Sequence, residues 1–129
     1  MNIQLKTVIL ECWDIPQLVS FYTNLLHWPV VYEIETFVGI HSNKDEIGIA
    51  FQYDENYIPP TWPARPGQQQ MMAHLDFAVA DKSELKEAVE KAVMLGAKKA
   101  DEQYGGEEWI TMLDPAGHPF CFVVWNHEA

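Results

Sequence analysis

The sequence predicts an α+β fold built from two similar βαβββ modules, and three observations support this prediction. First, Asp14 follows Thr7 by seven residues and Asp81 follows His74 by seven residues, and in both places a strand-like run leads into a helical pattern. Second, three further strand-like runs follow each helical pattern. Third, a proline-rich stretch separates the two copies. The chain therefore reads as an internal duplication.

The first copy begins with a predicted strand over residues 3–12, which is rich in β-branched and aliphatic residues. Asp14 then has the residue type and position of a helix N-cap, and Pro16 falls in the first turn, where its missing N–H costs little. Apolar residues follow at helical spacing until Trp28-Pro29 ends the helix: Leu18, Phe21, Tyr22, Leu25 and Leu26. Three strands are predicted next, over residues 30–34, 37–41 and 46–52.

Residues 54–70 are predicted to be a linker, because four prolines and a glycine in residues 58–68 support neither a strand ladder nor a helix. The stretch is aromatic, so we expect Tyr57 and Trp62 to pack on the surface. The predicted organisation is one domain over residues 1–129, with module one at 1–53 and module two at 71–129.

The second copy repeats the same order of elements. A strand is predicted over residues 71–80, and Asp81 with Glu84 has the spacing of a capping box. Gly96 has the position of the residue that ends a helix. The predicted helix carries an apolar stripe, and three short strands follow it; the stripe is Leu85, Ala88, Val89, Ala92, Val93 and Leu95, and the strands cover residues 98–103, 108–113 and 119–125.

Composition limits the classes of function. The chain has 129 residues, of which 48% are hydrophobic, so it can form a real core. Eight basic and nineteen acidic residues give a net charge of −11, which disfavours nucleic acid and anionic membranes as partners. Cys12 and Cys121 make no disulfide framework, and from the pattern of the residues we expect neither a signal peptide nor a membrane span. We therefore expect a cytoplasmic protein.

Motifs along nearly the whole chain resemble those of one superfamily. The chain resembles the vicinal oxygen chelate (VOC) superfamily of glyoxalase, bleomycin-resistance and dioxygenase-like proteins, and within it the glyoxalase-like domains of unassigned function. The resemblance implies two modules whose curved mixed sheets enclose a cleft, and a homodimer. One departure is His27, where the first helix of such proteins usually ends in glycine. The resembling residues are 14–16, 21–22, 25–26, 60–63, 74–79, 95–97 and 114–120.

The resemblance also implies where a metal site would lie. In members that use a metal, each module offers one ligand from its first strand and one from its last, usually histidine and glutamate. The matching positions here, which would line the cleft, are Thr7, Gln52, His74 and Cys121. Only His74 keeps the expected residue type. Gln52 offers a neutral amide oxygen, Thr7 is a poor ligand, and a Cys121 thiol in an apolar strand prefers to stay protonated.

Other polar residues offer further interpretations. Asp76 lies two residues from His74 on the same strand face, so its carboxylate either orients the imidazole or acts as a base. In the favoured interpretation it caps a neighbouring element or pairs with a cation. His74 and Asp76 are the catalytic candidates. His118 is either a base at the cleft edge or, in the favoured interpretation, a turn residue that caps backbone groups. We expect the remaining histidines, His27, His41 and His127, at the surface.

Three functional hypotheses follow. The missing carboxylates favour a protein that binds a small organic molecule in the inter-module cleft without the usual metal chelate. The alternative is a metal-dependent lyase, isomerase or dioxygenase in which His74, together with Gln52, holds a divalent metal. The second alternative is a dimeric scaffold or interaction protein. The sequence implies no certain cofactor.

Overall fold

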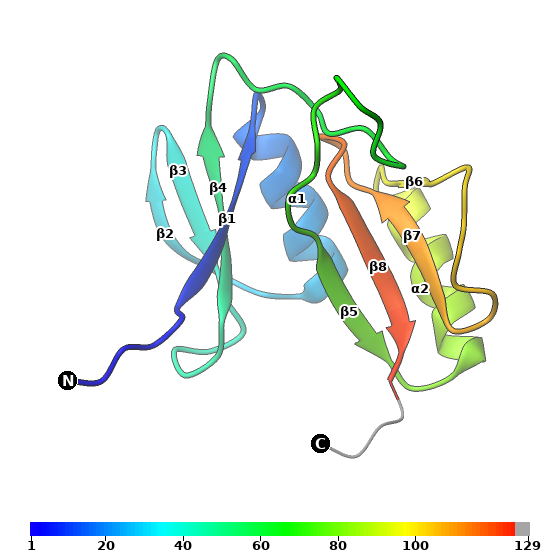
Figure 1. Cartoon of the computed structure of the whole chain (residues 1–129). Helices are drawn as coiled ribbons and strands as arrows, with labels where there is room; N and C mark the ends of the chain where they lie inside the picture. Colours follow the sequence, from blue (N-terminus) through cyan, green and yellow to red (C-terminus); the bar gives the residue numbers. More distant parts are fainter. Residues whose placement is uncertain (126–129) are drawn as a thin grey trace. The chain divides into compact units, whose positions relative to one another are not determined.

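The computed structural model describes residues 1–125 and divides the chain into two compact units, Met1–Tyr57 and Ile58–Ala129. Each unit contains one four-stranded mixed sheet and one helix (Figure 1). In each unit a strand, a helix and three further strands follow one another along the chain. The predicted pair of βαβββ modules is therefore confirmed.

The first unit pairs its first strand with its last. The strand order is β1-β4-β3-β2, with β1 parallel to β4 and the other pairs antiparallel. Because β1 and β4 are parallel neighbours, the two strands that the family resemblance singles out lie side by side. The elements are β1 (Thr7–Cys12), α1 (Ile15–Leu26), β2 (Val30–Ile34), β3 (Phe37–Ile40) and β4 (Gly48–Tyr53).

Helix α1 begins and ends as its cap residues dictate. The Asp14 side chain accepts a hydrogen bond from the Gln17 N–H at 3.1 Å, as the N-cap prediction requires. His27 ends the helix in the left-handed conformation, with φ 59° and ψ 36°, and its N–H donates to the Thr23 carbonyl oxygen. A side chain is disfavoured in this conformation, which explains why relatives usually place glycine there.

Helix α1 packs against strands β3 and β4 of the first sheet. The ring of Tyr22 stacks on that of Phe51, with centroids 5.5 Å apart and planes inclined by 17°. Because side chains alternate along a strand, Phe51 and Ile49 point to the helix while Ala50 and Gln52 point to the opposite face. The core of the first unit therefore lies between α1 and one face of the sheet.

The second unit repeats this arrangement. The strand order is β5-β8-β7-β6, with β5 parallel to β8 and the other pairs antiparallel (Figure 1). Helix α2 contacts all four strands. The elements are β5 (Leu75–Val79), α2 (Lys82–Met94), β6 (Lys98–Lys99), β7 (Trp109–Leu113) and β8 (Pro119–Val124).

Both ends of α2 follow the predicted capping pattern. The Asp81 side chain accepts from the Glu84 N–H at 2.8 Å. At the other end, Gly96 has φ +115°. Its N–H donates to the Val93 carbonyl oxygen, and the Ala97 N–H donates to the Ala92 carbonyl oxygen. These two hydrogen bonds form a Schellman motif. The predicted apolar stripe is only partly buried, because Val93 is 48% exposed.

Three phenylalanines form the core of the second unit on the side of α2. The rings of Phe77, Phe120 and Phe122 contact one another, with centroids 5.4–6.3 Å apart. Ile110 of β7 faces the same side, where it lines a groove with side chains of α2. Alternation along each strand therefore sends the neighbouring residues to the other face of the sheet. We call that surface the helix-free face of the second sheet; it carries Asp76, Ala78, Trp109, Thr111, Cys121 and Val123.

Several strands are shorter than the sequence pattern predicts. Strand β1 begins at Thr7 and not at Ile3, because residues 1–6 lie outside the sheet ladder and are exposed. Strand β5 begins at Leu75 instead of Met71. Strand β6 covers two residues, although the pattern predicts a strand over residues 98–103. Apolar content alone does not provide the strand partner that a ladder needs.

The proline-rich stretch folds back on the second unit from Ile58 onward. The Trp62 Nε1 donates to the Glu102 carbonyl oxygen at 3.2 Å, and its ring meets that of Tyr104 edge-on. Tyr57, in the first unit, makes an edge contact with Trp13. Both predicted aromatic contacts with the surface are present. Neither helix in residues 1–125 has the length and apolar character that crossing a bilayer requires.

Candidate functional site

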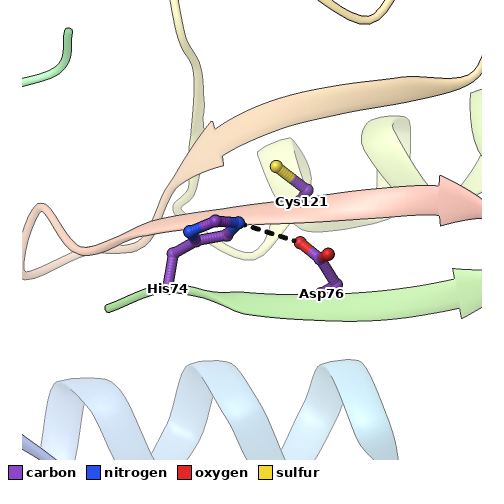
Figure 2. A group of neighbouring side chains, drawn as sticks. All are labelled: His74, Asp76 and Cys121. Carbon is purple, nitrogen blue, oxygen red and sulfur yellow. Dashed lines mark ion pairs between the residues drawn. The ribbon is translucent and has the colours of Figure 1, made fainter. Parts of the chain in front are cut away.

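Three side chains of the types that bind metal ions or transfer protons lie close together within the second unit. His74, Asp76 and Cys121 each contribute one donor atom, and these atoms all lie within 4.8 Å of one another. The Nε2 of His74 and the Oδ1 of Asp76 are 3.2 Å apart. Figure 2 shows the imidazole and the carboxylate on the same side of the segment that leads into β5, with the Cys121 thiol on the adjacent strand β8.

The strand register explains why these residues meet. Asp76 is paired with Cys121 across the parallel β5–β8 ladder, and Cys121 is paired with Thr111 across the antiparallel β7–β8 ladder. Directly paired residues project from the same face of a sheet. His74 stands just before β5, two residues from Asp76, so it shares that face. Asp76 therefore reaches the His74 imidazole, which is the less favoured of the two interpretations that the sequence left open.

The His74–Asp76 pair is accessible to solvent and to a ligand. The two side chains are 40% and 46% exposed. An aspartate at this distance can orient an imidazole and fix which ring nitrogen carries the proton. The pair can therefore present a hydrogen-bond donor and acceptors to a bound molecule, or transfer a proton to it.

The Cys121 thiol is poorly suited to act as a nucleophile. Burial raises the pKa of Cys121, and the nearby Asp76 carboxylate raises it further, although contact with the Thr111 hydroxyl at 3.4 Å opposes this shift. The cysteine is 6% exposed. The reactive species of cysteine is the thiolate, so at neutral pH the thiol is protonated and unreactive. This agrees with the expectation from its apolar strand.

Beyond the polar cluster, the helix-free face becomes apolar. The next row across the sheet consists of Ala78, Val123 and Trp109, which are paired in register. Trp109 is 38% exposed. This row lies two residues, or about 7 Å, from the row that contains Asp76 and Cys121. The face therefore combines a polar pair at β5 with an apolar row that ends at Trp109 on β7, two strands away.

Thr7 and Gln52 are placed by the register of the first sheet. Thr7 pairs with Gly48 and Gln52 pairs with Glu11, so the two residues lie four steps apart along the ladder, roughly 13 Å. Two ligands of one ion cannot be so far apart. The set Thr7, Gln52, His74 and Cys121, which the resemblance implies, therefore does not fit a single metal ion.

The register also identifies the residue of the first unit that corresponds to Cys121. Strand β5 pairs Leu75 with Phe120, which sets His74 opposite Pro119. Thr7 stands opposite Gly48 in the same way. Two residues further along the last strands are Ala50 and Cys121. Gln52 lies two positions beyond this equivalent site, a shift that sequence comparison without strand pairing does not detect.

His118 lies in the turn before β8, as the favoured interpretation expects, but the side chain that caps the backbone groups there is that of Asp114. The ring Nδ1 of His118 lies 2.8 Å from Oδ2 of Asp114, and the backbone N–H of His118 donates to Oδ1 of the same carboxylate at 3.0 Å. Oδ1 also accepts from the N–H of Ala116 at 2.9 Å. Asp114 is buried, so these donors hold the turn together.

The remaining histidines lie away from the His74 cluster in sequence, and the structure places two of them. His27 is exposed, as expected. His41 is half-buried, with its Nδ1 shielded from solvent, and so departs from the expected surface position. His127 lies outside the described residues.

Comparison with protein families gives a match over most of the chain. A family model described as "Glyoxalase-like domain" matches residues 7–123. No curated protein is significantly similar in sequence.

Solved structures with the same fold are distant in sequence. A glyoxalase/bleomycin resistance protein/dioxygenase family enzyme from Burkholderia phytofirmans PsJN is 17% identical, with a TM-score of 0.71 over 93% of this chain and 97% of its own. The fosfomycin resistance protein FosX from Mesorhizobium loti is 14% identical, with a TM-score of 0.70 over 98% and 94%. A variant of FosX from Listeria monocytogenes, complexed with Mn(II) and 1S,2S-dihydroxypropylphosphonic acid, is 15% identical, with a TM-score of 0.69 over 96% and 90%. At these identities the likeness establishes the fold alone.

Proposed function

This chain belongs to the glyoxalase-like domain family, and on that premise we propose that it binds a small amphipathic organic molecule on the helix-free face of the second sheet. The observation that carries the proposal is the accessible His74–Asp76 pair, with its atoms 3.2 Å apart. Binding sites for small molecules are largely apolar and contain a few precisely placed polar groups. This face has both components.

The expected ligand follows from the two rows of side chains. A polar group of the ligand, such as a hydroxyl or a carboxyl, would hydrogen-bond to His74 or Asp76. An apolar or aromatic body about 12 Å long would then extend diagonally across the sheet, past Val123 of β8, to the indole of Trp109 on β7. The chain's net charge of −11 disfavours ligands with several acidic groups, whereas a single acidic group can still pair with the imidazole.

A panel of small aromatic and amphipathic compounds, screened by thermal shift and followed by calorimetric titration, tests the proposal. A ligand at one hundred times its Kd stabilises the native state by about 2.7 kcal/mol, which a melting curve detects readily. We expect His74→Ala and Trp109→Ala each to weaken binding at least tenfold. Asp101→Ala, which changes an exposed acidic residue outside this face, is the control and should bind normally.

Two results would contradict the proposal. Binding that is unchanged in both the His74→Ala and the Trp109→Ala variants would place the ligand elsewhere. A broad panel without a single hit would favour a scaffold role instead.

A further inference from the structure

We infer that His74, Asp76 and Cys121 together bind one zinc-class transition-metal ion, held entirely within the second unit. The proposed function needs no ion, so this inference goes beyond it. The donor set also differs from the ligand arrangement that the family resemblance implies, because Asp76 stands at neither of the two strand positions that supply ligands there. The inference rests on three observations: donor spacing, donor chemistry and the rigidity of the strands.

The donor spacing is close to that of a tetrahedral site. Ligand atoms about 2.0–2.3 Å from one zinc ion lie about 3.3–3.6 Å from one another. The Nε2 of His74 and the Oδ1 of Asp76 are already 3.2 Å apart. All three donor atoms lie within 4.8 Å, so the Cys121 sulfur needs to approach by about 1 Å, which a rotation of these side chains can supply.

The donor chemistry selects the class of ion. Thiolate and imidazole are the ligands that zinc and cobalt prefer, whereas magnesium and manganese prefer sites made of oxygen atoms. One thiolate and one carboxylate carry two negative charges, which balance a divalent ion, and the imidazole binds as a neutral ligand. A thiol that coordinates a metal is deprotonated outright, so the ion itself converts Cys121 to the ligating form.

Two of the three donors, Asp76 and Cys121, stand on paired strands, and the third, His74, directly precedes β5. Asp76 and Cys121 are directly paired in the β5–β8 ladder, and the Thr111 hydroxyl lies 3.4 Å from the Cys121 sulfur on its other side. Sites on regular elements hold their ligands more precisely than sites on loops. Three protein ligands also leave one tetrahedral position open, which is the pattern of zinc sites that interact with a further small molecule.

The test is direct metal titration of protein that was purified without a polyhistidine tag and stripped with EDTA. We expect one Zn²⁺ per chain in competition with a chromophoric chelator, and an affinity for Mn²⁺ at least about 100-fold weaker. Co²⁺ should give a thiolate-to-metal charge-transfer band, because the inference requires sulfur ligation. Loss of outer-shell partners alone costs 10–100-fold in affinity, so His74→Ala, Asp76→Asn and Cys121→Ser should each weaken Zn²⁺ binding by at least about 100-fold.

Matched controls separate the site from the rest of the chain. Cys12→Ser changes the other cysteine, in the first unit, and Asp101→Asn changes an exposed aspartate; both should keep wild-type affinity. If Cys121→Ser fails to fold, His74→Ala still decides the matter, because His74 is 40% exposed and its loss leaves no cavity.

The inference is overturned by sub-stoichiometric Zn²⁺, by a Co²⁺ spectrum without the thiolate band, or by wild-type affinity in the His74→Ala variant. Its failure is distinguishable from failure of the proposed function. A small molecule that binds in the presence of EDTA, in a protein that takes up no zinc, would overturn the inference and leave the proposed function in place. Stoichiometric zinc binding, together with no binding of any organic compound in the panel, would overturn the proposed function and leave the inference in place.

Discussion

The side chain of Gln103 takes the place of a strand beside Thr111. Its Oε1 accepts a hydrogen bond from the Thr111 N–H, and its Nε2 donates to the Thr111 carbonyl oxygen, both at 2.8 Å. The same amide nitrogen donates to the Ala100 carbonyl oxygen at 2.8 Å. Strand β6 ends at Lys99, so the Gln103 side chain continues the pairing of β7 next to the row that contains Cys121.

Replacing Gln103 with leucine should therefore destabilise the protein by about 2–3 kcal/mol. The substitution keeps the approximate volume but leaves the buried Thr111 N–H without this partner, whereas the Thr111 carbonyl oxygen keeps its hydrogen bond from the Ala100 N–H. Denaturant unfolding measures the change, and Gln68→Leu, at an exposed position, is the control. A loss no larger than that of the control would show that solvent replaces the Gln103 amide at little cost.

Two glycines of the first sheet should respond differently to alanine. A Cβ on Gly48 would lie 2.7 Å from the Ile40 carbonyl oxygen, whereas a Cβ on Gly39 would meet its nearest neighbour, the Tyr32 Cβ, at 3.8 Å. We expect Gly48→Ala to lower the free energy of unfolding by about 1–3 kcal/mol, because the β3–β4 backbones must separate locally. Gly39→Ala should be neutral or slightly stabilising.

The measurement is again the free energy of unfolding for both variants. Equal effects of the two substitutions would contradict the close backbone approach at Gly48.

Glu11 and Asp54 should make stability depend on pH. The hydrogen bond with Asp54 raises the pKa of Glu11, and burial and the Asp54 charge act in the same direction. A raised pKa in the native state means that the contribution of Glu11 to stability is present when it is protonated and is lost as the pH rises through that pKa. At neutral pH the two carboxylates repel each other.

Glu11→Gln should therefore be more stable than the wild type at pH 7, and the difference should vanish as the pH falls into the titration range of glutamate. Glu11 is largely exposed, so solvent screening limits the gain to about 0.5 kcal/mol or less. Unfolding curves across this pH range measure the effect. Glu35→Gln, in the turn between β2 and β3, is the control. A gain that does not change with pH would exclude the carboxylate pair as its cause.

Much of the fold could be predicted because its signals are local. Asp14 and Asp81 cap helices through hydrogen bonds to residues three positions away, and Gly96 ends α2 through its own backbone conformation. Each of these features depends on a few consecutive residues. The strand ends could not be predicted so well, because residues 3–6 have strand-like composition but no partner in the ladder.

The candidate site could be predicted only in part. Alternation along the chain predicts that His74 and Asp76 share one face, and the structure confirms this and shows the two side chains in contact. The contribution of Cys121 to the same cluster depends on the β5–β8 register, and the support from Gln103 depends on where β6 ends. The choice of Gln52 as a ligand position failed for the same reason, because the strand register places Ala50, and not Gln52, at the position of the first sheet that is equivalent to Cys121.

The sequence by itself determined the duplication, the helix caps, the charge of −11 and the presence of His74 and Asp76 on one strand face. These follow from periodicity and from contacts between near neighbours along the chain. Only the tertiary structure decided that Asp76 faces Cys121, from which it is separated by 45 residues, and that Thr7 and Gln52 lie too far apart to share an ion. The physical reason is that strand register is set by the packing of whole sheets, and a shift of two residues preserves the alternation of faces while it changes every partner.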